Sequence, residues 1–224
     1  MTSSKGDELL TELYGKTLTG NGPAVLELTR TGLSRGLGPE TLLYEALIPA
    51  LEEVGARFER GDFFVPEMLI AGKAMAGALE ILRPLLAETG AEPIGKVVMG
   101  TVKGDVHDIG KNLVNIMFEG AGFQVIDLGV QVSPDKFVDA VKIHKPDIVG
   151  FSAFLTTTMP MFKANLHALT KAGLRDQVIV MVGGAPVTQE YADVVGADGY
   201  AADASAAVVK AKELIRHRRA LANA

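Results

Sequence analysis

Residues 96–110 read KVVMGTVKGDVHDIG, and this stretch decides the fold of the C-terminal part of the chain. Its first six residues, Lys96–Thr101, form a short run rich in valine, which predicts a buried β-strand. A helix is expected to begin at about Gly110. A strand, a short loop and a helix in this order make a βα unit, from which sheets of parallel strands are built.

The alternation of strand and helix continues to the end of the sequence. Further strands are predicted at 124–128, 147–152, 178–182 and around Tyr200, and helices at 134–144, 159–172, 188–195 and 204–219. This pattern predicts a Rossmann-like, flavodoxin-like α/β fold, in which helices cover both faces of a parallel sheet. Ligands of such folds bind beyond the carboxyl ends of the strands, so a site is expected in the turns that follow them.

The first part of the chain has a different pattern, with apolar side chains at helical spacing. Helices are predicted at 7–18, 23–36, 39–58 and from 66 to about 86, so this part is expected to be an all-α helical bundle. Pro39 and Pro66 suit the first turn of a helix, where a missing N–H loses no hydrogen bond. Pro49 falls inside a predicted helix and is expected to kink or divide it.

The segment Thr89–Gly95, TGAEPIG, is short and rich in residues that break helices. We expect it to link the two parts of the chain. The predicted domains are therefore a helical bundle over residues 1–90 and an α/β domain over residues 91–224.

The composition of the 224 residues limits the class of protein. With 48% hydrophobic and 22% charged residues, and no apolar run of the roughly 18 to 20 residues that span a membrane, a globular cytoplasmic protein without a membrane partner is expected. The absence of cysteine excludes disulfides, thiolate metal sites and a cysteine nucleophile, so soft chemistry must come from a bound cofactor. A net charge of -5 without a basic block argues against nucleic acid as a partner.

The loop after the first strand combines glycines with a carboxylate and an imidazole. Five residues separate Gly104 from Gly110, whereas a phosphate-binding loop needs four, and no Gly-x-Gly-x-x-Gly follows any predicted strand. Asp105 precedes His107 by two residues, so its carboxylate can accept the imidazole N–H when the loop curls. The other ring nitrogen then offers a lone pair of fixed direction, as a metal ligand does. Taken alone, this short motif favours a solvated histidine that caps the next helix.

Two later turns change this interpretation. SAFLTTT, residues 152–158, follows the third predicted strand, and Gly183-Gly184 follows the fourth. Together with Asp105-x-His107-x-x-Gly110 they resemble the cobalamin-binding domains of methionine synthase and of the small corrinoid proteins of methyltransferase systems. That family has Asp-x-His-x-x-Gly, Ser-x-Leu and Gly-Gly at similar separations; here 41 residues separate Gly110 from Ser152, and 28 separate Phe154 from Gly183.

The resemblance implies that the chain binds cobalamin or a related corrinoid. His107 would be the lower axial ligand of the cobalt, in place of the base that the cofactor itself carries. Asp105 would hold the second imidazole nitrogen and Thr158 would stand behind Asp105, so that the three form a proton-linked relay.

The resemblance also implies a set of cofactor-binding residues around this ligand. They are Gly104, Asp105, Val106, His107, Asp108, Ile109 and Gly110 in the first loop, Ser152, Phe154, Leu155 and Thr156 in the second, and Gly183, Gly184 and Ala204 along the slot for the nucleotide tail. Phe154 replaces the leucine of the family and is expected to reshape that slot.

The resemblance extends into the helical part through Val54–Glu67. In the family this bundle caps the upper face of the corrin, and Phe58 and Val65 fall on the two covering positions, although Val65 replaces a leucine. Met68 and Met75 are interpreted as core residues of the bundle.

For function, the resemblance implies a carrier that is not catalytic by itself. It would accept a methyl group on cobalt from a substrate-specific methyltransferase with a methanol-, methylamine-, betaine- or methoxyarene-type donor. A second methyltransferase would pass the group to a thiol or to tetrahydrofolate, and a corrinoid reductive activase is a further expected partner.

Other functions of the same domain remain open. A cobalamin-binding sensor or regulator is disfavoured because residues 1–90 contain no basic recognition helix. The adenosylcobalamin-binding subunit of a mutase is disfavoured by the helical cap. A serine hydrolase built on Ser152 and His107 is disfavoured because the sequence around Ser152 lacks the closing glycine of a nucleophile elbow.

Overall fold

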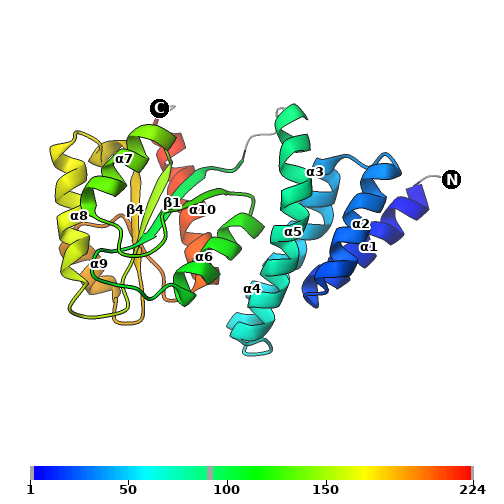
Figure 1. Ribbon diagram of the computed structural model, residues 1–224, viewed down its shortest axis with the longest axis horizontal. Helices are drawn as coiled ribbons and strands as arrows, with labels where there is room; N and C mark the ends of the chain where they lie inside the picture. The colour runs from blue at the N-terminus through cyan, green and yellow to red at the C-terminus, as the bar shows by residue number, and fades with distance from the viewer. Residues whose placement is uncertain (1–2, 90–92, 223–224) are drawn as a thin grey trace. The chain divides into compact units, whose positions relative to one another are not determined.

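A computed structural model describes residues 3–89 and 93–222. The chain divides into two compact units, one of Met1–Pro93 with Glu119–Gly122 and one of Ile94–Phe118 with Phe123–Ala224. The first is helical and the second is built on a parallel sheet, which confirms the predicted fold class (Figure 1). Part of the predicted linker, residues 90–92, lies outside the described residues, and the boundary at residue 90 stays a prediction. No helix within the described ranges is long and apolar enough to cross a membrane.

The helical unit is held by a core of leucines and methionines. Its elements are α1 (Ser3–Leu18), α2 (Gly22–Ser34), α3 (Pro39–Leu42), the π-helix η1 (Leu43–Leu47), α4 (Ile48–Glu59) and α5 (Val65–Thr89). The long helix α5 packs on α2, and it also contacts α1 and α4. Met68 and Met75 are buried in this core, as predicted.

The expected disturbance at Pro49 takes the form of a π-helical turn. In η1 the hydrogen-bonding pattern widens, so that the N–H of Ile48 reaches the carbonyl of Leu43. Pro49 follows directly as the second residue of α4, so the widened turn lies just before the residue that has no N–H to donate. The chain therefore stays helical from Pro39 to Glu59, with a change of winding instead of a break.

The second unit contains five parallel strands in the order β2-β1-β3-β4-β5. They are β1 (Lys96–Thr101), β2 (Gln124–Asp127), β3 (Ile148–Ser152), β4 (Ile179–Gly183) and β5 (Gly199–Tyr200). The helices between and after them are α6 (Ile109–Gly120), α7 (Pro134–His144), α8 (Pro160–Lys171), α9 (Gln189–Val195) and α10 (Ala204–Ala222), with a 3-10 turn at Arg175–Gln177. Figure 1 shows α7, α8 and α9 on one side of the sheet and α6 and α10 on the other.

Both faces of this sheet are buried, and the face toward α7 and α8 has an aromatic core. Alternate residues of a strand point to opposite faces, so Val149 and Phe151 join that core while Ile148 is buried on the other side. The ring of Phe151 meets the ring of Phe137 edge-on, with centroids 4.7 Å apart. The sheet is thus a rigid support for the loops at its carboxyl edge.

The topology places two of these loops at a switch point. From β1 the chain passes to the outer strand β2 and then returns across β1 to β3. The connections after β1 and β3 therefore leave the sheet in opposite directions, and ligands of open α/β sheets bind where this happens. Here the two loops are residues 102–108 and 153–159. The last residues of three strands, Thr101, Ser152 and Gly183, stand in register below them.

Candidate functional site

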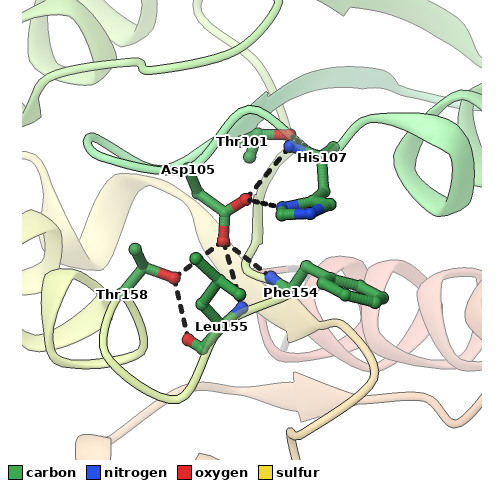
Figure 2. A network of polar contacts seen from close by, with 6 residues as sticks. All are labelled: Thr101, Asp105, His107, Phe154, Leu155 and Thr158. Atoms are coloured by element: carbon green, nitrogen blue, oxygen red, sulfur yellow. Dashed lines mark hydrogen bonds and ion pairs between the residues drawn. The ribbon is translucent and has the colours of Figure 1, made fainter.

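The carboxylate of Asp105 joins the two loops of the switch point, and the residue is fully buried (Figure 2). Its Oδ2 accepts hydrogen bonds from the backbone N–H of Phe154 at 2.8 Å and of Leu155 at 3.2 Å, and from the hydroxyl of Thr158 at 2.7 Å. Its Oδ1 accepts from the backbone N–H of His107 at 3.0 Å and lies 2.8 Å from the imidazole Nδ1. One side chain therefore fixes loop 102–108 to loop 153–159.

These donors also determine the charge of Asp105. Burial by itself raises the pKa of a carboxyl group, because the charged form loses its hydration. The hydrogen bonds from Thr158, from the backbone and ring of His107 and from the backbone of Phe154 outweigh burial, and they hold the pKa of Asp105 well below its usual range. Asp105 is therefore an acceptor, and the hydrogen of the imidazole lies on Nδ1.

The imidazole of His107 is fixed on two sides and open on a third. Its side chain is 44% exposed, Nδ1 is bonded to Asp105, and one face of the ring stacks on Phe154 with centroids 4.3 Å apart and 26° between the planes. The lone pair of Nε2 lies in the plane of the ring, so stacking on the face does not cover it. Among the residues that the structure describes, Nε2 has no hydrogen-bond partner. This is the geometry of a metal ligand held by a carboxylate.

Two contacts of the loop backbone were not predicted from the sequence. The hydroxyl of Thr101 donates to the carbonyl of His107 at 3.0 Å, and the N–H of Gln131 donates to the carbonyl of Asp105 at 3.1 Å. Thr101 is the last residue of a predicted strand, and only that position could have drawn attention to it. Gln131 follows a different strand, β2, so no local pattern links it to the loop.

Four of the predicted cofactor-binding residues are exposed apolar side chains on the two loops. Val106 and Ile109 are 57% and 71% exposed in and after the first loop, and Phe154 and Leu155 are 52% and 39% exposed in the second. Large apolar side chains gathered in the open around a functional group indicate a ligand surface. The site therefore offers an apolar surface next to the open nitrogen of His107.

The remaining predicted residues of the second unit also lie at the carboxyl edge of the sheet. Gly104, with a φ of +86°, turns the first loop, and Asp108 accepts the first backbone hydrogen bond of α6 from Asn112. A Cβ added at Gly110 would meet nothing within 4 Å, so open space lies beside this glycine. Ser152 ends β3, Thr156 is exposed in the second loop, and Ala204 is the buried first residue of α10.

Gly183, the last residue of β4, and Gly184, the residue after it, differ in how much space their surroundings leave for a side chain. A Cβ at Gly184 would lie 1.8 Å from the carbonyl oxygen of Ala153, and the φ of +135° is one that side chains rarely adopt. A Cβ at Gly183 would meet only the carbonyl oxygen of Ala201, at 3.9 Å. Gly184 is therefore needed so that the chain after β4 can approach the loop after β3. Packing within the protein does not explain Gly183.

Phe58 and Val65 belong to the helical unit. Phe58 is partly buried in the last turn of α4, and Val65 is the 38% exposed first residue of α5. They are thus close in sequence on either side of one interhelical turn. Their role over a cofactor stays a prediction.

Comparison with known proteins agrees with this fold. Residues 95–209 match a family described as B12 binding domain, and residues 9–83 match a second family with the same description. The chain is 44% identical over 210 residues to dimethylamine corrinoid protein 1 of Methanosarcina acetivorans, covering 93% of this chain and 98% of that protein. Trimethylamine corrinoid protein 2 of Methanosarcina mazei is 41% identical over 192 residues, covering 85% and 88%.

A solved structure extends the similarity to both units. A chain in the crystal structure of the methanol:cobalamin methyltransferase complex MtaBC from Methanosarcina barkeri superposes with a TM-score of 0.83 at 29% identity, covering 94% of this chain and 80% of that one. Fold and site together thus define a B12-binding domain that follows a helical domain. The chain belongs to the corrinoid proteins of methyltransferase systems, and it binds cobalamin or a related corrinoid.

The residues of the site fit such a cofactor. A corrin is a broad and largely apolar ring around a cobalt ion, so a protein that holds it would supply a nitrogen donor and an apolar surface. The open Nε2 of His107 would supply the donor, and the exposed side chains of Val106, Ile109 and Phe154 would supply the surface.

The lowered pKa of Asp105 predicts how an Asp105→Asn variant responds to pH. An amide in this position turns an N–H toward other donors, so the variant is expected to be less stable than the wild type at neutral pH. Below the ordinary aspartate pKa of about 3.9, the unfolded wild-type chain takes up a proton before the folded protein does, and the contribution of Asp105 is lost as the pH falls further. The difference in the free energy of unfolding should therefore shrink toward acid.

Urea unfolding of the cofactor-free protein at a series of pH values between about 7 and 3 measures this difference, across the range in which aspartate titrates. Asp139→Asn, at an exposed position in α7, is the matched control and should unfold like the wild type throughout. A difference for Asp105→Asn that stays constant over this range would contradict the assignment of a lowered pKa.

Proposed function

We propose that this chain carries a methyl group on the cobalt of its corrinoid between two methyltransferases, with His107 as the protein ligand of the metal. The observation that carries the proposal is a half-exposed imidazole whose Nδ1 is tied to a buried carboxylate and whose Nε2 is open. When bound, the corrinoid supplies a cobalt that accepts and releases methyl groups. The protein residues then have two tasks, to orient the ligand and to hold its proton.

Asp105 serves both tasks. With the lone pair of Nε2 engaged, the imidazole is neutral and its Nδ1–H points to the carboxylate 2.8 Å away. When the imidazole is released, Nε2 can take up a proton, and the charged carboxylate of Asp105 stabilises the resulting imidazolium. Thr158 supports Asp105 from the other side through a hydrogen bond of 2.7 Å. His107, Asp105 and Thr158 thus act together as a relay that couples ligand release to proton uptake.

The proposed methyl donor is a methylated amine. The support is the similarity to the dimethylamine and trimethylamine corrinoid proteins, which extends over most of their length. We assign the donor-side partner as a methyltransferase that acts on dimethylamine, and the acceptor-side partner as a methyltransferase that acts on a thiol or tetrahydrofolate. A reductive activase and a cytoplasmic location complete the proposal. The roles of sensor and mutase subunit have no comparable support.

Phe58 and Val65 are assigned to the opposite face of the cofactor. Both are apolar, and they flank the turn between α4 and α5. Such a cover keeps water and oxygen from a reactive metal. It has to move aside when a partner enzyme reaches the cobalt.

His107→Ala tests the ligand. The protein is reconstituted with hydroxocobalamin and reduced to Co(II), and the nitrogen coupling in the electron paramagnetic resonance spectrum is recorded with ¹⁴N- and ¹⁵N-histidine. In the wild type, labelling should change the coupling pattern, whereas in His107→Ala it should have no effect because the protein imidazole is gone. His167→Ala, at an exposed position in α8, is the control and should behave as the wild type. A labelling effect that persists in His107→Ala would refute the assignment.

Methyl transfer assays test the donor. The holoprotein, activated to Co(I), is combined with purified methyltransferases for dimethylamine, trimethylamine or methanol and the matching substrate, and methylation is followed by the visible spectrum. The dimethylamine enzyme should methylate it fastest. Faster methylation by the methanol enzyme would overturn the donor assignment while leaving the carrier function in place.

Phe58→Ala tests the cover. Loss of the ring opens a path for solvent, so the Co(I) form of the holoprotein should oxidise several-fold faster in buffer of fixed oxygen content, while the amount of bound corrinoid stays the same. Tyr44→Ala removes a 43% exposed ring elsewhere in the helical unit and is the matched control. Equal oxidation rates for wild type and Phe58→Ala would remove Phe58 from the cover.

A further inference from the structure

Lys111 is a buried lysine close to the site that the proposed function does not use. The residue is 3% exposed and lies in the first turn of α6, two residues after its start. Its Nζ is 2.6 Å from Oδ2 of Asp127, at the end of β2, and 2.7 Å from Oδ1 of Asn112. Lysine is almost never fully buried unless it is paired, so a buried Lys111 that connects α6 to β2 indicates a specific role.

The Lys111–Asp127 pair is not expected to add much to the stability of the fold. An ammonium loses much of its hydration on burial, and the first turn of a helix disfavours positive charge because the helix dipole is positive there. The partner carboxylate is 39% exposed, so solvent screens part of the attraction. A buried ion pair of this kind is weak evidence for stabilisation, and a role in fixing one arrangement of the chain explains it better.

The pair holds the segments that support His107. The other oxygen of Asp127, Oδ1, accepts the N–H of Gly129 at 2.9 Å, and the carbonyl of Gly129 accepts the N–H of Thr101 at 3.0 Å. Thr101 in turn donates to the carbonyl of His107. On the helix side, α6 begins two residues after His107. Lys111 therefore ties the start of α6 to the segment after β2 that also contacts the end of β1.

We infer that Lys111 and Asp127 are positioning residues for the cobalt ligand. The hydrogen bonds of Asp105 fix loop 102–108 to loop 153–159, which follows β3. The Lys111–Asp127 pair fixes the start of α6, where the same loop ends. With both restraints the imidazole of His107 cannot pivot about Asp105, and its Nε2 keeps one position relative to the sheet. This inference rests on the proposed role of His107.

Lys111→Met tests the inference, because methionine keeps the length of the side chain and removes its charge. The variant is reconstituted with hydroxocobalamin and reduced to Co(II), and the ratio of histidine-coordinated to uncoordinated cobalt is measured by electron paramagnetic resonance with ¹⁵N-histidine. We expect this ratio to fall about tenfold, the lower end of what partners behind a metal ligand contribute. The amount of bound corrinoid should stay the same. Lys142→Met, at an exposed position in α7, is the control and should leave the ratio unchanged.

Asp127→Asn is the second variant. The amide oxygen can still accept the N–H of Gly129. The amide NH2 then replaces the oxygen that accepts from Lys111, so the ion pair is lost and the ratio should fall in the same direction. An unchanged ratio in folded Lys111→Met overturns the inference, and so does loss of the corrinoid with the fold intact, because that outcome assigns the pair to binding. If Lys111→Met does not fold, Asp127→Asn decides by the same criterion. A wild type without histidine coupling would instead refute the proposed function itself.

Discussion

The site depends on one buried carboxylate that accepts hydrogen bonds from two loops. Asp105 receives backbone N–H groups of His107, Phe154 and Leu155, and these belong to connections that leave the sheet after different strands. The topology of the sheet brings the loops to one place, but it does not fix the distance between them. The carboxylate does, and it remains charged because so many donors surround it. The direction of the imidazole is a consequence of this charge.

The sheet provides a rigid support, and the loops at its carboxyl edge carry the groups with chemical roles. The strands and the aromatic core around Phe151 hold the strand ends in register, while the groups with chemical roles stand above them in the loops. Gly184 allows the chain after β4 to approach the second loop, because any side chain there would meet the carbonyl of Ala153. Among the described residues, the groups of this cluster come from the loops after β1 and β3. The proposed contribution of the helical unit lies in covering the opposite face of the cofactor.

The sequence was sufficient to predict the strands, the helices and the pair of Asp105 and His107, because each depends on local spacing. Valine-rich runs separated by amphipathic segments have few alternatives to a βα series, and a carboxylate two residues from an imidazole can meet it within one loop. The contacts of Thr101, Gln131 and Lys111 could not be predicted from the sequence, because they do not depend on local spacing. They join segments brought together by strand order and register, which no local pattern encodes. The π-helical turn before Pro49 is a similar case, since the proline indicated a disturbance but not its form.

The hydroxyl of Thr158 has one hydrogen and two acceptors, Oδ2 of Asp105 at 2.7 Å and the carbonyl of Leu155 at 2.8 Å. The branched side chain of threonine restricts rotation about its first torsion, so the oxygen can keep its place while the hydrogen changes direction. Exchange between the two acceptors then requires only rotation about a single C–O bond. The number of hydrogen bonds that Asp105 accepts can thus change without movement of either loop.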